Sequence, residues 1–201
     1  LDIWKRRQTE YKKIVAYTTR DMREGETQHK SYHFISLEDF STKKELSFFA
    51  EFAGYDTIWG KQYYGTAKSD YSDDMVIIIG KSGSGKDTTV EKLLTLETDN
   101  ECDVVIMNPI GLSQIKKNDA PGIVVYLKPS DKTISKYLLR RGDNATEVKR
   151  RAKADEIDFT GIEKYVDIII SCDGKAPGDI AKEIDKKISL RKNYLFKENA
   201  V

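Results

Sequence analysis

Short apolar runs alternate with longer polar segments along the second half of the chain. The apolar runs occupy residues 75–79, 103–107, 122–127 and 165–170. Charged segments of helical length occupy residues 131–141, 147–158 and 178–190. Ser130 and Asp131 are both suited to cap the first of these segments. Apolar strands that alternate with helices predict an α/β fold in which helices cover both faces of a parallel sheet.

Residues 1–74 have a different pattern. Residues 14–17 are predicted to join the parallel sheet. Residues 32–35 and 48–52 are short and rich in aromatic side chains, and a further segment ends at Tyr63-Tyr64-Gly65. Aromatic residues favour strands. This part of the chain is therefore predicted to form a small β-rich subdomain.

A glycine-rich loop follows the first of the apolar runs. Residues 80–87 read Gly-Lys-Ser-Gly-Ser-Gly-Lys-Asp, and a predicted helix starts with Thr88. Glycines let the backbone turn its N–H groups inward, the helix N-terminus adds positive potential, and Lys86 adds a charge, so the pattern favours phosphate binding over a turn without function. The loop does not name the reaction, because GTPases, ATPases and kinases all use it.

One position of the loop departs from the usual phosphate-loop pattern. Asp87 stands where a serine or threonine hydroxyl usually holds Mg²⁺, although Thr88 and Thr89 follow at once. An aspartate can bind Mg²⁺ through water, because this ion keeps much of its hydration shell.

Composition narrows the class of protein further. The chain has 201 residues, 39% hydrophobic and 33% charged, with a net charge of +1. This length fits one domain or a core with inserted subdomains, and the balanced charge predicts no nucleic-acid partner. The longest apolar run is too short to span a bilayer, and no apolar leader opens the sequence, so we expect no membrane association.

The cysteines and histidines suggest a location but no metal site. Cys102 and Cys172 each flank a predicted strand and are expected to be reduced, which predicts a cytoplasmic protein. Together with His29 and His33 they could supply zinc ligands, but their spacing lacks the pairs that are typical of such sites.

Two arginine clusters accompany the loop. Arg20 and Arg23 follow a predicted strand, and Tyr32 comes nine residues later. Two guanidinium groups and a phenol can grip one phosphate dianion, whereas the alternative is a solvated charged loop. Arg141 and Arg151 flank a short polar segment, a layout suited to a mobile lid. The alternative there is a helix face with exposed ion pairs.

Taken together, these segments resemble the guanylate kinase family over nearly the whole chain. Residues 18–26 and 32–34 are similar to the family's GMP-binding entry, and residues 49–53 to its guanine-reading strand. The other similar segments are 63–66, which closes the GMP-binding part, 140–142 with Arg151, which form the lid, and 168–173, the last strand and adenine-side loop.

The resemblance implies a fold and an organisation. The fold is the three-layer core of P-loop NTPases with a parallel sheet, a small β-rich subdomain for the nucleoside monophosphate (NMP) and a helical lid. The implied parts are 1–17 (core strand entry), 18–68 (NMP-binding subdomain), 75–140 (core with the phosphate loop), 141–160 (lid) and 161–201 (rest of the core). The implied assembly is a monomer or a homodimer.

The implied activity is transfer of the γ-phosphoryl of ATP, with Mg²⁺, to GMP or dGMP. The catalytic residues would be Lys86, Arg141, Arg151 and Arg20. ATP would be bound by Gly80, Lys81, Ser82, Gly83, Ser84, Gly85, Lys86, Asp87 and Thr88, and Mg²⁺ by Asp87 or Thr88. GMP would be bound by Arg20, Arg23, Tyr32, Glu51, Tyr64, Thr66 and Asn108.

Several departures from the family's pattern keep alternatives open. Ala16 and Asn108 replace a serine and an aspartate near the guanine, so a kinase for another or a modified (d)NMP is one alternative. A non-catalytic guanylate-kinase-like binding module is another. The stretch between Glu51 and Tyr63 is longer than usual. In addition, the phosphate loop follows the NMP-binding part in this sequence, whereas in the family it comes first. Because a site depends on geometry and not on chain order, the same contacts can form in either order.

Overall fold

The fold is described from a computed structural model that covers residues 10–117, 122–141 and 145–198. Its core is a parallel sheet with the strand order β1-β7-β6-β8-β9. These strands are β1 (Tyr11–Lys13), β6 (Met75–Gly80), β7 (Cys102–Ile106), β8 (Ile123–Lys128) and β9 (Ile168–Ser171). The predicted parallel sheet is therefore confirmed.

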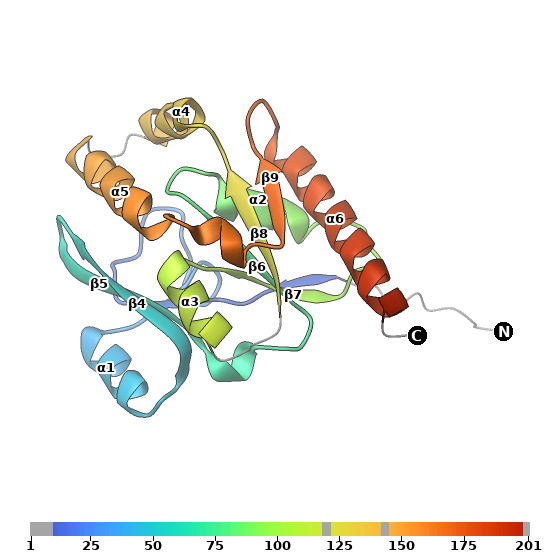
Figure 1. Cartoon of the computed structure of the whole chain (residues 1–201). Helices are drawn as coiled ribbons and strands as arrows, with labels where there is room; N and C mark the ends of the chain where they lie inside the picture. Colours follow the sequence, from blue (N-terminus) through green and yellow to red (C-terminus); the bar gives the residue numbers. More distant parts are fainter. Residues whose placement is uncertain (1–9, 118–121, 142–144, 199–201) are drawn as a thin grey trace.

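Helices cover both faces of this sheet, which makes the core three layers deep (Figure 1). The helices are α1 (Leu37–Glu45), α2 (Lys86–Leu93), α3 (Pro109–Lys117), α4 (Asp131–Arg141), α5 (Ala145–Asp158) and α6 (Pro177–Glu198), with short 3₁₀ turns at Lys68–Asp70 and Ile162–Tyr165. Val76 and Ile78 pack with α2 and α6, and Ile77 and Ile79 pack with α3. Alternate side chains of β6 thus enter opposite layers, and none of them is exposed to water.

A second sheet holds the β-rich part of the chain. Its strand order is β3-β2-β5-β4, with β2 (Tyr17–Thr18), β3 (His33–Phe34), β4 (Phe49–Thr57) and β5 (Gly60–Ala67). The long β4–β5 hairpin is antiparallel. Helix α1 packs against it through Phe40, which is 1% exposed and stacks on Phe49 at a centroid distance of 4.5 Å. This aromatic packing explains why a segment with few aliphatic residues forms a sheet.

Several boundaries differ from the sequence predictions. The core strand expected at residues 14–17 lies at Tyr11–Lys13, because the chain leaves the core sheet there and Tyr17 enters the second sheet. Strand β9 begins at Ile168, after a 3₁₀ turn. Helix α6 continues beyond residue 190 to Glu198, and Lys192 in this extension pairs with Asp74.

The chain order of the core is unusual but its sheet is continuous. Strand β1 precedes the second sheet in sequence and pairs with β7, which pairs with the phosphate-loop strand β6. Asp185 of α6 ties this edge together, because it accepts hydrogen bonds from the Tyr11 hydroxyl and the Asn100 amide, both at 2.8 Å. The segment before the loop therefore reaches the same sheet as the segments after it.

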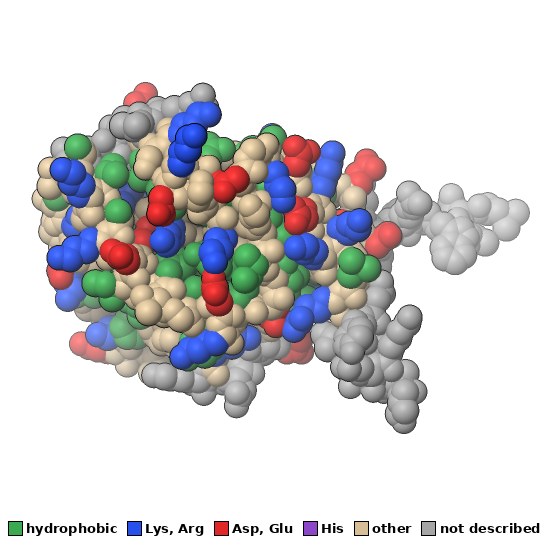
Figure 2. Space-filling view, turned by 45° about the horizontal axis from the view of Figure 1, so that its top comes forward, with side chains coloured by type: hydrophobic (Ala, Val, Ile, Leu, Met, Phe, Trp, Pro, Cys, Tyr) green, Lys and Arg blue, Asp and Glu red, His purple; other side chains and the backbone are tan. Residues whose placement is uncertain are grey.

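Charges of both signs are distributed over the surface. Figure 2 shows Lys and Arg side chains interspersed with Asp and Glu over the face that it presents. No helix in the described part of the chain combines the length and apolar character needed to cross a bilayer.

Candidate nucleotide-binding site

A cavity of about 270 Å³ lies between the phosphate loop, the second sheet and α5. Most of the residues expected to bind nucleotides lie on its wall. They are Arg20, Arg23, Tyr32, Glu51, Tyr64, Gly80, Ser82, Gly83, Lys86, Asp87, Asn108 and Arg151. The structure thus collects, at one place, side chains from three separate parts of the sequence.

A smaller group of expected residues is not on this wall. Lys81, Ser84, Gly85 and Thr88 belong to the loop or to the first turn of α2, and Thr66 lies behind Glu51. Arg141 ends α4, and its side chain lies outside the described residues. Its expected catalytic role stays a prediction.

The phosphate loop has the strand–loop–helix context that its sequence predicts. Gly83 and Gly85 adopt positive φ angles of 79° and 80°, which side chains disfavour. Gly80 approaches β8 so closely that a Cβ atom would lie 2.9 Å from the Leu127 carbonyl oxygen. Lys86 begins α2, and its ammonium donates to the Gly80 and Lys81 carbonyl oxygens at 2.6 and 3.0 Å. The positive end of α2 and this ammonium make the loop a site for anions.

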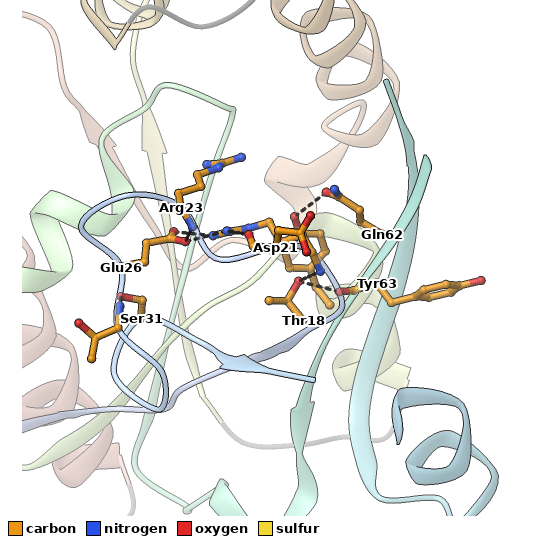
Figure 3. Close-up of polar contacts among 10 residues, drawn as sticks. Thr18, Asp21, Arg23, Glu26, Ser31, Gln62 and Tyr63 are labelled. Atoms are coloured by element: carbon orange, nitrogen blue, oxygen red, sulfur yellow. Dashed lines mark hydrogen bonds and ion pairs between the residues drawn. The ribbon is translucent and has the colours of Figure 1, made fainter. Parts of the chain in front are cut away.

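The loop after β2 holds Arg20 in a defined position. Arg20 is 7% exposed, and its two terminal nitrogens donate to the Glu26 carboxylate at 2.7 and 2.5 Å. Burial acts to lower the pKa of Arg20, but the Glu26 hydrogen bond together with the charges of Tyr64, Glu26 and Tyr32 raises the pKa overall. The Arg23 amide also donates to Glu26, while the Arg23 side chain points away from Ser31 (Figure 3). Glu26, which sequence reasoning left without a role, therefore organises both arginines.

Aromatic rings form the wall next to these arginines. The Arg20 guanidinium lies 4.9 Å from the centre of the Tyr32 ring, and Tyr32 contacts Tyr64. Burial raises the pKa of Tyr32, and the negative charge of Asp87 raises it further. Tyr32 and Asp87 therefore interact across the cavity wall that they share. Tyr55 of the lengthened hairpin contacts Tyr64 and also lines the cavity, a position that sequence reasoning did not single out.

Glu51 has the most unusual environment in the cavity. It is 4% exposed, and its Oε1 atom accepts a hydrogen bond from Thr66 at 2.9 Å. Thr66 gives its only proton to Glu51, so Tyr71, whose hydroxyl is 2.6 Å away, donates to Thr66. The Oε2 atom is buried and has no hydrogen-bond partner within the described residues. Burial raises the pKa of Glu51 to about 7, against the lowering effect of the Thr66 bond.

Helix α3 confines this carboxylate. A Cβ atom at Gly111 would lie 2.2 Å from Glu51 Oε2, so no other residue fits there without moving Glu51. Asn108 Oδ1 accepts the Gly111 N–H at 2.8 Å and caps the helix. Gln114 pairs with both the N–H and the carbonyl of Phe52 in β4. Neither Gly111 nor Gln114 was predicted, since their partner strand lies far away in sequence.

The oxygen donors that sequence reasoning assigned to a metal ion lie in the loop and the first turn of α2. Asp87 lines the cavity, and Thr88 follows it on the helix. Within the described residues no group of three or more His, Cys, Asp or Glu side chains could hold a metal ion. A carboxylate and a hydroxyl are ligands that suit Mg²⁺, which binds proteins through few groups and keeps several waters.

The fold and the loop define the class of the protein: it has the architecture of a P-loop NTPase. The crystal structure of guanylate kinase from Anaplasma phagocytophilum has a similar fold, with a TM-score of 0.56 and 17% identity over 90% of this chain and 76% of that chain. At this identity the likeness concerns the fold alone.

Sequence comparisons show similarity to guanylate kinases. The family model described as guanylate kinase matches residues 2–71. Guanylate kinase of Clostridium tetani is 33% identical over 153 residues, which are 75% of this chain and 61% of that protein. Guanylate kinase of Haemophilus influenzae is 27% identical over 191 residues, which are 93% of this chain and 79% of that protein. Over most of its length the chain is therefore similar to guanylate kinases.

The extent of the matches varies. The chain spans 61% of the Clostridium tetani protein and 54% of guanylate kinase from Syntrophus aciditrophicus, a relative that is 31% identical over 139 residues. The part matched by the family model precedes the phosphate loop, which begins at Gly80.

Proposed function

We propose that this chain transfers the γ-phosphoryl of ATP to GMP or dGMP, giving ADP and (d)GDP. The observation that carries the proposal is the buried Oε2 atom of Glu51, on the cavity wall opposite the phosphate loop, which has no hydrogen-bond partner in the part of the chain that the structure describes. The Watson–Crick edge of guanine presents two adjacent donors, N1–H and the exocyclic amine, whereas adenine presents an acceptor at N1. An ionised carboxylate pairs with guanine and leaves adenine unmatched.

The rest of the acceptor site consists of cationic and phenolic groups. Arg20, Arg23, Tyr32 and Tyr64 lie on the same wall as Glu51 and would hold the GMP phosphate. Thr66 orients the Glu51 carboxylate from behind, and Asn108 lies on the wall at the start of α3. Charge-assisted hydrogen bonds from guanidinium groups to phosphate are strong and directional.

The donor site is the phosphate loop, residues 80–88. Its amides, the N-terminus of α2 and Lys86 would bind the ATP phosphates, and Lys86 with Arg151 and Arg141 would stabilise the transferring group. Asp87 or the Thr88 hydroxyl would hold Mg²⁺, through water in the case of Asp87. When bound, Mg²⁺ supplies neutralisation of phosphate charge.

The reaction needs positioning rather than a general base. The acceptor phosphate is already an oxyanion, so no proton has to be removed before it attacks. The protein aligns the two phosphates in line, excludes water and offers positive charge. We propose that two parts of the chain close on the core to achieve this alignment: the NMP-binding subdomain, residues 18–68, and the lid, residues 141–160. The core consists of residues 75–140 and 161–201, with residues 1–17 as its entry strand.

We also propose a cellular location for the protein. Cys102 and Cys172 are buried and free. Free thiols of this kind are typical of a reducing compartment. This observation supports a cytoplasmic location.

One alternative acceptor is supported by specific positions. Ala16 and Asn108 both lie on the cavity wall, and Asn108 uses its amide oxygen to cap α3. Both differ from the residues that the family places near guanine, which favours a second candidate, a kinase for another or a modified (d)NMP. A non-catalytic binding module is disfavoured by Lys86, because a scaffold has no need for a lysine directed at phosphate.

The test is an ADP-release assay with ATP and a panel of acceptors: GMP, dGMP, AMP, CMP and TMP. We expect turnover with GMP or dGMP well above that with the others. Preference for a different monophosphate would support the second candidate. Absence of turnover with all of them would exclude a kinase acting on these acceptors, and ATP binding measured by calorimetry would then show whether the loop still binds a nucleotide.

A further inference from the structure

Helix α5 is bonded directly to the phosphate loop. The Ser82 N–H donates a hydrogen bond of 2.7 Å to Asp155 Oδ2, across 73 positions of sequence. Both residues lie on the cavity wall. A carboxylate that accepts a backbone N–H forms a charge-assisted bond, which is stronger than one between neutral groups. The lid helix and the donor site are therefore mechanically connected at this point.

The same face of α5 carries Arg151. Arg151 and Asp155 are four residues apart, so they project from one side of the helix, and both line the cavity. One turn beyond Asp155 the helix is anchored by Phe159, which is 9% exposed and stacks on Tyr126 of β8 at 5.4 Å. Phe159 holds the C-terminal end of the helix, and the Asp155 bond adds a fixed point closer to Arg151.

We propose that Asp155 is a positioning residue that locks α5 onto the phosphate loop and thereby places Arg151 at the transferring phosphoryl group. This inference rests on the proposed phosphoryl transfer. Positioning matters here because a displacement of about 1 Å at a reacting centre can reduce a rate about 100-fold. A rotation of α5 about Phe159 would move Arg151 by more than it moves Phe159, since Arg151 is two turns away from that anchor.

An opposite role for the same contact predicts opposite kinetics. Asp155 could compete with ATP for the Ser82 N–H, and its negative charge would repel the incoming phosphates. Removing that charge would then tighten ATP binding and leave turnover at saturation unchanged. The positioning role predicts instead that ATP binding is nearly unchanged and that turnover falls. Measuring kcat and KM for ATP separately therefore distinguishes the two roles: positioning changes kcat, and competition changes KM.

The decisive variant is Asp155→Asn, with Glu156→Gln as its matched control. Glu156 is the next residue of the same helix, carries the same charge and is exposed. In Asp155→Asn we expect kcat with ATP and GMP to fall by about 10- to 100-fold, as for a lost charge-assisted bond, while KM for ATP stays within about twofold. Glu156→Gln should behave as the unsubstituted protein, and Asp155→Glu should restore part of the loss. Unchanged kcat, or a fall in KM for ATP alone, would overturn the proposal.

A second readout does not depend on activity. The exchange rate of the Ser82 amide hydrogen, measured by mass spectrometry or NMR on the full chain, should rise in Asp155→Ala, which removes the acceptor, and stay unchanged in Glu156→Gln. Equal exchange in both variants would overturn the connection itself. If the unsubstituted protein phosphorylates no monophosphate, the proposed function fails while this measurement still decides whether Asp155 holds the loop. Thermal unfolding of both variants verifies that they are folded.

Discussion

Replacing Glu51 by glutamine should stabilise the folded protein at alkaline pH and weaken its binding to guanine. Burial raises the pKa of Glu51 from 4.5 to about 7. This difference in pKa between the unfolded and the folded state changes the free energy of unfolding by about 3 kcal/mol between low and high pH, at about 1.4 kcal/mol per pKa unit. The folded state binds this proton more tightly than the unfolded state, so the associated stability is fully present below pH 4.5 and is lost as the pH rises through 7.

The assay is urea unfolding of both proteins from pH 4.5 to pH 8. The unfolding free energy of Glu51→Gln minus that of the unsubstituted protein should increase by about 3 kcal/mol over this interval, since the glutamine cannot ionise. Glu91→Gln, an exposed substitution on α2, provides the control and should show no such change. Parallel pH profiles for Glu51→Gln and the unsubstituted protein would refute the reasoning.

Binding of GMP provides a second measure of the same carboxylate. Guanine donors favour the ionised form of Glu51, so GMP binding near pH 6.5 should release protons. Calorimetry in buffers with different ionisation enthalpies would detect this release, and Glu51→Gln should reduce it to the part that comes from the GMP phosphate, whose second pKa is about 6. GMP binding without any proton release in the unsubstituted protein would show that Glu51 does not meet the base.

Three further substitutions test other parts of the site and fold. Lys86→Met removes the ammonium that bridges the loop, and steady-state kinetics should show kcat reduced by about 100-fold or more. Gly111→Ala places a methyl group 2.2 Å from Glu51 Oε2, so calorimetry should show GMP affinity reduced about tenfold with ATP affinity unchanged. Asp185→Ala removes the carboxylate that accepts hydrogen bonds from Tyr11, Thr98 and Asn100, and urea unfolding should show a loss of about 3 kcal/mol.

Local sequence patterns predicted the parts of the site that are local in the chain. The phosphate loop is one continuous segment with a buried strand before it and a helix after it, so its residues and their geometry were predictable together. The core strands β7 and β8 were also predictable within a residue or two, because a strand buried on both faces is apolar throughout.

Features that depend on distant packing were not predictable. Helix α1 buries only Phe40 and therefore lacks an apolar stripe, and α3 begins at a proline that reads equally well as a turn. The space for Glu51 Oε2 depends on Gly111, and the Asp155 bond depends on the placement of a helix 73 residues away. Such contacts are set by how the elements pack, which no local pattern encodes.

The most direct test of the account is the ratio of kcat/KM for GMP to that for inosine monophosphate, with ATP as donor. Inosine monophosphate retains N1–H and lacks the exocyclic amine, so it leaves one oxygen of Glu51 unmatched. Loss of one hydrogen bond to a buried carboxylate lowers kcat/KM by about 10- to 100-fold. We therefore predict a ratio of kcat/KM in this range, with AMP a still poorer acceptor. A ratio near one, or AMP used as well as GMP, would contradict the claim that Glu51 reads guanine opposite the phosphate loop.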